Sequence, residues 1–252
     1  MTIQIIVNGD DLGLSAEVNE AIFRGMEQGV ITSATMLPNG SAVIPAARML
    51  HRFPNCSFGV HLNLTEFQPM CADSRTALSS ILDERNCFDG NAIREVRISA
   101  PMLRAIYKEW CAQIDHLIQL GVQPSHLDAH HHVHTVPQML PVLAALRRRY
   151  RINKARISLN MYDPATPASR VLLSKKWLYN QALRCIGFKT TRIFTELEVF
   201  INVCAVQPPR EPLIELMTHP GSVLSSEEPG LLGSDWTKKL SYPVALVSYK
   251  AL

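Results

Sequence analysis

The chain has 252 residues, of which 47% are hydrophobic and 19% are charged, and its formal net charge is +3. This composition excludes a disordered or fibrous protein. The charge is too small to suggest a nucleic-acid partner or an acidic membrane surface. A length near 250 residues fits either two small domains or one large α/β barrel. We expect a single domain over residues 1–252.

The N-terminal residues carry no export signal that we can identify. Met1 to Val7 contains no basic segment and no small-residue cleavage site, and no apolar run reaches the roughly 18–20 residues of a membrane span. The six cysteines are scattered without a C-x-x-C pair, which is typical of reduced thiols. We therefore expect a cytoplasmic protein with no membrane segment.

Strand-like and helix-like segments alternate along the chain. In the first quarter of the chain, the pattern predicts a strand at 3–7, a helix from Ser15 to Gly29, a strand at 31–37 and a helix at 42–50 interrupted by Pro45. A strand at 58–64 and a helix at 103–118, closed by Gly121, follow. Next come a short strand ending near His130 and a helix from Pro137. Further strand candidates are 156–160, 199–203, 213–218 and 244–249, whereas 65–103 and 160–198 are expected to be long loops.

This alternation predicts a parallel α/β protein. About seven strands suit a (β/α) barrel of the TIM type, regular or distorted, at least as well as an open doubly wound sheet. The first strand-to-helix turn is Asn8-Gly9-Asp10-Asp11-Leu12-Gly13 rather than G-x-G-x-x-G. Two carboxylates there would repel a pyrophosphate, which argues against dinucleotide binding.

The densest chemical signal is a histidine cluster. Residues 126–134 contain five of the nine histidines: His126, His130, His131, His132 and His134. Neutral imidazole is the commonest metal ligand, and its second nitrogen needs a partner that orients it. We expect one or two of these histidines to bind a metal, and the others to hydrogen-bond or line the site. The alternative is an accidental polar loop.

Three further features are weak when taken singly. Asp10-Asp11 could be a helix cap, His61 could be a satisfied core histidine, and His219 precedes Pro-Gly at a strand end. Together with His130, however, they all fall at the C-terminal ends of predicted parallel strands, where active sites of α/β proteins assemble. A carboxylate with two imidazoles suits one divalent ion, Zn²⁺ by its nitrogen ligands or Mg²⁺ if water completes the shell. The second carboxylate could then take a proton, so the set predicts metal-assisted hydrolysis.

The same residues resemble the YdjC-like carbohydrate deacetylases over most of the chain. Four segments carry the resemblance: Val7 to Ser15, Gly59 to Thr65, His126 to His134 and Met217 to Pro220. It implies a barrel enzyme that removes N-acetyl groups from amino sugars such as diacetylchitobiose, and relatives suggest a homodimer. By position, Asp11, His61 and His130 would bind the metal, Asp10 would be the general base and His219 the general acid. We assign His126, Asp128, His132, His134 and Arg192 to substrate binding or to orienting the ligands.

The chain also departs from the family pattern. Gly9 and Leu12 stand where the family often has Ala and Phe, and Glu66-Phe67-Gln68-Pro69 replaces the usual Gly-x-Pro. Arg192 lies where a neutral or acidic residue is expected. Because Arg pairs with carboxylate or phosphate, a charged acetylated sugar is one hypothesis, and a surface position for Arg192 is the other.

Two other functions stay open. A metal-dependent phosphoesterase on a similar barrel would need more ligands and a basic pocket, for which Arg192 and Lys189 are the only hints. A non-catalytic sugar- or metal-binding protein could keep the histidines, but it would not need both Asp10 and Asp11.

Overall fold

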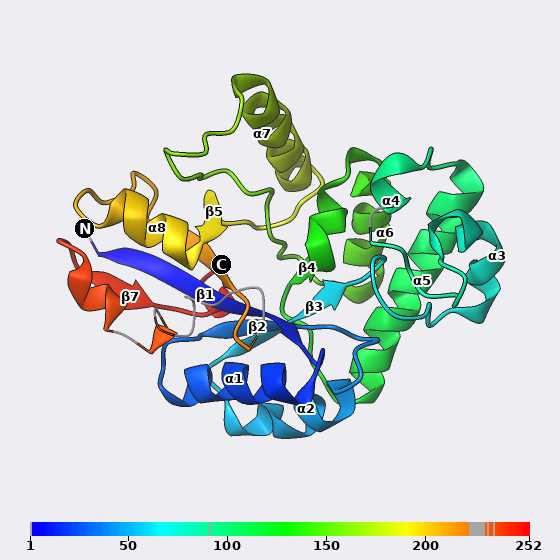
Figure 1. Cartoon of the computed structure of the whole chain (residues 1–252), viewed down its shortest axis with the longest axis horizontal. Coiled ribbons are helices and arrows are strands. Elements are labelled where there is room, and N and C mark those ends of the chain that lie inside the picture. Colours follow the sequence, from blue (N-terminus) through cyan, green and yellow to red (C-terminus); the bar gives the residue numbers. More distant parts are fainter. Residues whose placement is uncertain (1, 91, 222–229, 231, 234) are drawn as a thin grey trace.

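The computed structural model describes residues 2–90, 92–221, 230, 232–233 and 235–252. It contains a curled parallel sheet in the order β4-β3-β2-β1-β6-β5, with β7 paired to β1 (Figure 1). The strands are β1 (Ile3–Leu12), β2 (Ser33–Met36), β3 (Ser57–Leu62), β4 (Leu127–Ala129), β5 (Ile193–Glu196), β6 (Leu213–Thr218) and β7 (Val244–Leu246).

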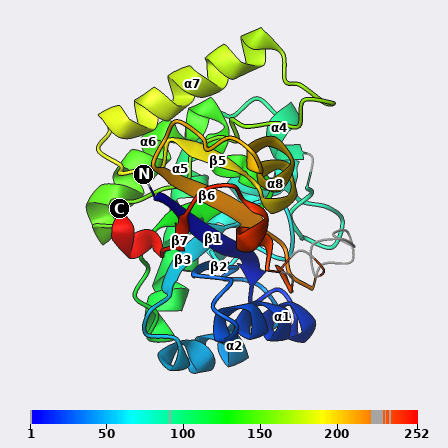
Figure 2. The same ribbon diagram turned by 90° about the vertical axis from the view of Figure 1, so that its left-hand side faces the viewer.

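Helices lie around this sheet. They are α1 (Ala16–Glu27), α2 (Val43–Met49), α3 (Arg75–Leu78), α4 (Ala92–Glu95), α5 (Ala100–Gln119), α6 (Leu140–Tyr150), α7 (Arg170–Cys185) and α8 (Leu197–Cys204). Of these, α1, α5 and α8 contact the strands of the sheet. In Figure 2, α1 and α2 lie on one side of the curl and α7 on the other. The outer strand faces and the inward helix faces form one large apolar core.

Local sequence signals explain where the main helices begin. Ser15 and Ser99 adopt extended backbone and accept hydrogen bonds from the N–H groups of Val18 and Met102, so both act as N-caps. Pro45 does not interrupt α2, contrary to expectation. It is the third residue of that helix, where a backbone N–H has no helical partner to lose.

The sheet curls like a barrel without a complete ladder of strands among the described residues. On one edge of β1, β7 pairs with its first residues and β2 with its last, while β6 pairs along the other edge. Between β4 and β5, residues 153–160 form isolated bridges and no strand. Toward β4, Arg156 N–H donates to Leu127 O and Leu127 N–H donates to Lys154 O, and on the other side backbone bonds join residues 153–160 to Lys189 and Phe194. The expected (β/α) barrel is therefore confirmed as a curled parallel α/β sheet and not as a regular closed barrel.

Four predicted segments differ in the structure. Residues 199–203 lie in helix α8, because Leu197, Phe200 and Cys204 are buried at helical spacing and tertiary packing outweighs the β-branched composition. The segment 156–160 occupies a strand position but forms no strand. The stretch 160–198, expected as a loop, contains α7, capped by Ser169, and strand β5.

The stretch 65–103, also expected to be loop, contains the short helices α3 and α4 and the start of α5. In the described part of the chain, no helix combines the length and apolarity that a membrane crossing needs.

Candidate active site and metal centre

The site lies at the C-terminal ends of β1, β3 and β4. Asp10 and Asp11 are the last polar residues of β1, and a β-bulge shifts the register between Gly9 and Leu12. Asp11 has a left-handed backbone, with φ of 66°, which Asp tolerates better than most residues. In a regular strand successive side chains point to opposite faces. The bulge instead lets both carboxylates reach the same polar centre.

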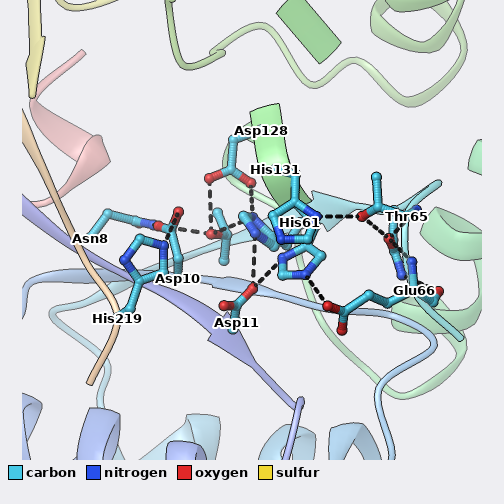
Figure 3. A network of polar contacts seen from close by, with 12 residues as sticks. Asn8, Asp10, Asp11, His61, Thr65, Glu66, Asp128, His131 and His219 are labelled. Atoms are coloured by element: carbon cyan, nitrogen blue, oxygen red, sulfur yellow. Dashed lines mark hydrogen bonds and ion pairs between the residues drawn. The ribbon is translucent and has the colours of Figure 1, made fainter. Parts of the chain in front are cut away.

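Asp11, His61 and His130 bring their ligand atoms within 4.8 Å of one another. Figure 3 shows Asp11 next to His61. Asp11 Oδ1 is 3.1 Å from His61 Nε2 and 2.7 Å from His130 Nδ1, and all three side chains are at most 10% exposed. This buried oxygen has no hydrogen bond of regular geometry, although both imidazoles lie close to it. One acidic oxygen and two ring nitrogens gathered in this way are typical of a metal-ligand set.

The surroundings of His61 orient its ring. His61 Nδ1 lies 2.6 Å from Asp128 Oδ1 and 3.2 Å from Thr35 Oγ1, so Nε2 is the nitrogen that faces Asp11. Burial opposes protonation of this imidazole, but Asp128 and Asp11 outweigh burial and raise its pKa to about 10. The carboxylates therefore make the centre strongly favourable for a positive charge.

The three side chains also suit a divalent cation. Burial opposes ionisation of Asp11, yet its contacts with His130 and His61 hold its pKa well below the usual range. One ionised oxygen and two nitrogens, with ligand atoms within 4.8 Å of one another, match the donor set of a catalytic Zn²⁺ site. An imidazole held by a carboxylate on its second nitrogen is the usual arrangement around such ions. These residues fit the metal.

Asp10, by contrast, is held by side chains that leave it outside the ligand set. Arg156 binds both of its oxygens, with Nη1 2.6 Å from Oδ2 and Nη2 2.7 Å from Oδ1. Asn8 Nδ2 donates a further hydrogen bond to Oδ1 over 2.8 Å. His219 lies on the open side, with Nε2 3.9 Å from Asp10 Oδ2 and its side chain 34% exposed. The predicted base and acid are therefore brought next to each other.

Arg156 is the centre of a buried network that the sequence analysis missed. Its guanidinium also lies 2.8 Å from Asp128 and 2.7 Å from Glu215, and Tyr249 donates to the other oxygen of Glu215 over 2.6 Å. All four of these side chains are fully buried. A charged residue inside an apolar run, as in Leu213-Ile214-Glu215-Leu216 and Ala155-Arg156-Ile157, was the available signal.

The remaining histidines, His126, His132 and His134, pack around the residues of the centre. His126 stacks on Tyr249 with ring centroids 3.5 Å apart and lies against Gly59, where an added Cβ would be 2.6 Å from the imidazole. His134 Nε2 lies 3.3 Å from the Arg156 carbonyl oxygen. Burial lowers the pKa of His126 to about 3 and that of His134 to about 4, so both are neutral near pH 7. His132 is also largely buried, and its ring meets Phe194 edge-on.

The chain that presents His130 is strained. His131 and His132 both have left-handed backbone, with φ of 49° and 57°. Each such residue costs roughly 1–2 kcal/mol. The conformation is held by a hydrogen bond from Arg94 to the His131 carbonyl and by one from Thr135 Oγ1 to the His132 carbonyl, over 2.8 Å. His131 Nδ1 lies 3.0 Å from Thr65 Oγ1, so this ring lies against the loop that follows β3.

Two residues lie differently from expectation. Arg192 is exposed and directly precedes β5, at the N-terminal end of that strand, so the structure does not bring it to the other site residues. Glu66, noted only as a departure from the family pattern, has Oε1 3.5 Å from His130 Nε2. It is half exposed and could add a carboxylate to the metal centre. The group of Glu66, His130 and His131 is itself compatible with a cation.

The chain is similar to proteins of one family over most of its length. The YdjC-like protein family matches residues 4–240. A carbohydrate deacetylase of Halalkalibacterium halodurans is 37% identical over 58% of this chain and 61% of its own length, and one of Geobacillus stearothermophilus is 38% identical over 58% and 57%. The matches thus span less than two thirds of these bacterial relatives. A carbohydrate deacetylase of Xenopus laevis is 29% identical over 90% of this chain and 84% of its own length.

A solved structure shares the fold. A protein of Enterococcus faecalis, described as a candidate for cellobiose-phosphate cleavage, superposes with a TM-score of 0.77 over 100% of this chain and 99% of that one, at 24% identity. The family match extends from the first strand, which carries both aspartates, to Leu240, beyond His219. The chain belongs to the YdjC-like protein family.

Proposed function

We propose that the protein is a metal-dependent hydrolase that removes the N-acetyl group from an amino sugar. The proposal rests on one observation: the adjacent carboxylates of Asp10 and Asp11 have different partners. Asp11 faces His61 and His130, whereas Asp10 is bound by Arg156 and kept out of that set. The names of the relatives, carbohydrate deacetylases, support the same reaction class.

The reaction uses these residues in separate roles. A divalent ion held by Asp11, His61 and His130 would polarise the amide carbonyl and lower the pKa of a water molecule. Asp10 would receive at Oδ2 the proton that the attacking water loses, a general-base contribution of about 10²–10⁴-fold. His219, on the open side of Asp10, would donate a proton to the leaving amine. The amide C–N bond breaks, and acetate and the free amino sugar are released.

Nearby side chains hold these groups in place. Asp128 fixes the ring of His61, and Arg156 fixes the plane of the Asp10 carboxylate. The two nitrogen ligands favour Zn²⁺, and Mg²⁺ is the second candidate. The cluster Asp10–His61–Asp128 could also be read as a cation site. Arg156 already supplies a positive charge to both of its carboxylates, so we assign a single ion to the centre.

The deciding experiment is acetate release from N,N′-diacetylchitobiose by protein reconstituted with Zn²⁺ or Mg²⁺. Release that stops when a chelator is added is the expected result. Hydrolysis of a generic aryl phosphate without acetate release would instead support the phosphoesterase. Metal binding with neither reaction would support a binding protein.

The homodimer and the cytoplasmic location stay predictions, and light scattering of the purified protein tests the first of them.

A further inference from the structure

The carboxylate of Glu66 reaches the candidate metal centre from the loop that follows β3. Its Oε1 lies 3.5 Å from His130 Nε2, and its side chain is 43% exposed, whereas that of His130 is 8% exposed. Figure 3 shows Glu66 on the side of Asp11 that faces away from Asp10 and His219. Glu66 is therefore not placed to exchange a proton with the proposed base or acid, and its contact in the centre is with a ligand.

The two ring nitrogens of His130 have different neighbours. Nδ1 lies 2.7 Å from Asp11 Oδ1, whereas Nε2 faces Glu66 and makes no hydrogen bond although it is buried. An imidazole that binds a metal through one nitrogen carries its proton on the other. An ion shared by Asp11 and Nδ1 therefore leaves a buried N–H at Nε2, and a buried donor needs an acceptor. The carboxylate of Glu66 is the acceptor that lies beside it.

His61 shows the same arrangement with a different carboxylate. Its Nε2 lies 3.1 Å from Asp11 Oδ1, and its Nδ1 lies 2.6 Å from Asp128 Oδ1. Each histidine thus has one nitrogen toward Asp11 and the other toward a second carboxylate. Such a carboxylate fixes the ring and makes its other nitrogen a better ligand. The difference is that Asp128 is fully buried in β4, whereas Glu66 reaches its histidine from a half-exposed position.

Buried side chains hold the backbone of Glu66 at this place. Asn63, which is fully buried, accepts from the Glu66 N–H over 3.2 Å and donates to the Glu66 carbonyl over 2.7 Å. Asn39 donates to the same carbonyl over 3.3 Å. Farther along the loop, the buried Glu109 of α5 accepts from the Cys71 N–H over 2.7 Å. These bonds fix the point from which the carboxylate reaches the histidine, as the positioning of a ligand requires.

We infer that Glu66 is a positioning residue of the metal centre, which accepts a hydrogen bond from His130 Nε2 and so keeps Nδ1 directed at the ion. The inference rests on the metal centre of the proposed function, and it does not depend on which bond the enzyme hydrolyses. Because the carboxylate is tied to His130 and not to the ion, its loss should weaken the metal site without abolishing it.

Competition for Zn²⁺ with a chromophoric chelator, on the full-length protein, measures this role without turnover. Glu66→Ala should weaken Zn²⁺ binding about 10–100-fold, the usual cost of losing a partner that orients a ligand. Glu66→Gln still offers an amide oxygen to the Nε2–H, so we expect it to restore the affinity to within about fivefold of the parent protein. Parent-like affinity in Glu66→Ala would overturn the inference. So would equal losses in both variants, because Glu66 would then act through its charge as a ligand.

Glu84→Ala is the matched control, since it removes the same charge from an exposed glutamate outside the groups of described residues that could hold a cation. It should bind Zn²⁺ as the parent protein does, and a comparable loss of affinity would show that only net charge matters. Urea unfolding of the chelated variants should give unchanged midpoints, because Glu66 is half exposed. A lower midpoint for Glu66→Ala alone would make its weaker binding a folding defect and would contradict the positioning role.

The protonated nitrogen of His130 can be observed directly by NMR. In Zn²⁺-loaded protein labelled with ¹⁵N-histidine, the proton should be on Nε2 and the metal on Nδ1. A metal-bound Nε2 would refute the inference, because it would place the ion among Glu66, His130 and His131, a second group that could hold a cation.

Acetate release separates this inference from the proposed function. If Glu66→Ala and Glu66→Gln differ in Zn²⁺ affinity as expected, yet the parent protein releases no acetate from N,N′-diacetylchitobiose, the deacetylase is rejected and the role of Glu66 stands. Chelator-sensitive acetate release, with equal Zn²⁺ affinities in the parent protein and both variants, would have the opposite meaning.

Discussion

The carboxylate of Asp10 has about four positions for hydrogen bonds, and Arg156 and Asn8 occupy three of them. The remaining position is on Oδ2, the oxygen that lies 3.9 Å from His219. The protein therefore leaves one defined atom of Asp10 for proton transfer. The sequence shows only that two aspartates are adjacent, whereas the structure identifies the one oxygen of Asp10 that can accept a proton.

Substitutions at Asp10 and at His130 should distinguish the loss of the general base from the loss of a metal ligand. Asp10→Asn removes the proton acceptor, so we expect turnover to fall about 10²–10⁴-fold with metal content retained. His130→Ala should lose both. The control is His51→Ala, an exposed histidine that belongs to none of the groups that could hold a cation and that should keep both metal and turnover. Metal analysis and acetate release measure these effects, and unchanged metal content in His130→Ala would contradict the ligand assignment.

Arg156 should be essential for stability as well as for orienting the base. Arg156→Met leaves Asp10, Asp128 and Glu215 buried without their cation, which typically costs about 3–5 kcal/mol. Arg148→Met, on the exposed end of α6, should change the free energy of unfolding by less than about 0.5 kcal/mol. Urea unfolding of both chelated variants gives the comparison. Similar stabilities for the two would show that the network contributes little.

At the scale of elements, the position of β3 depends on the absence of a side chain at Gly59. A Cβ there would lie 2.6 Å from the ring of His126, which is itself stacked on Tyr249. We expect Gly59→Ala to destabilise the protein by about 1–3 kcal/mol. His126→Ala makes room for the added methyl, so Gly59→Ala should cost much less in that background. A double-mutant cycle by thermal unfolding measures this coupling, and additive effects would refute it.

The elements also show which predictions the sequence supports. Strands β1, β3 and β6 and helices α1 and α5 were predicted because their apolar periodicity and, for α1, the cap Ser15 are local signals. The cap Ser99 was not recognised, so the start of α5 was placed at residue 103 instead of 100. Helix α8 was mistaken for a strand, since Val199, Ile201 and Val203 suggest β structure until the packing of Phe200 is known. Helix α7 was missed because few of its residues are buried.

Part of the candidate site could be predicted from the sequence, because several of its residues lie at strand ends. Asp10, Asp11, His61, His130 and His219 each end a strand, so a parallel sheet brings them together whatever its details. Arg156 and Glu215 come from segments with no pattern of their own, and only the curl of the sheet shows that they meet. The exposed position of Arg192 depends on the start of β5, which the sequence did not reveal.

For the molecule as a whole, buried neutral histidines predict acid sensitivity. The pKa of His126 is about 3 and that of His134 about 4 in the folded state, against 6.5 for an ordinary histidine. Below pH 6.5 the unfolded chain therefore binds more protons than the folded one, and stability falls as pH falls toward these values. Each histidine contributes up to about 1.4 kcal/mol for each pH unit in this window.

Urea unfolding of chelated protein between pH 7 and 5 tests this expectation. The free energy of unfolding should decrease on acidification, with at least two protons taken up per molecule unfolded near pH 5. His134→Gln can still donate to the Arg156 carbonyl but does not titrate, so its profile should be shallower by about one proton. A profile that matches the parent protein would show that His134 is not a buried neutral base.

Tyr249 connects the end of the described chain to the catalytic centre. It is fully buried, stacks on His126 and donates to Glu215, which pairs with Arg156. A fragment that stops before Val244 would keep every motif by which the family is recognised, yet it would lack the group that closes the charge network beneath Asp10. Sequence motifs alone would classify such a truncated gene product as an enzyme, although its base would be unsupported. The C-terminal segment is therefore a separate requirement for the activity that we propose for this chain.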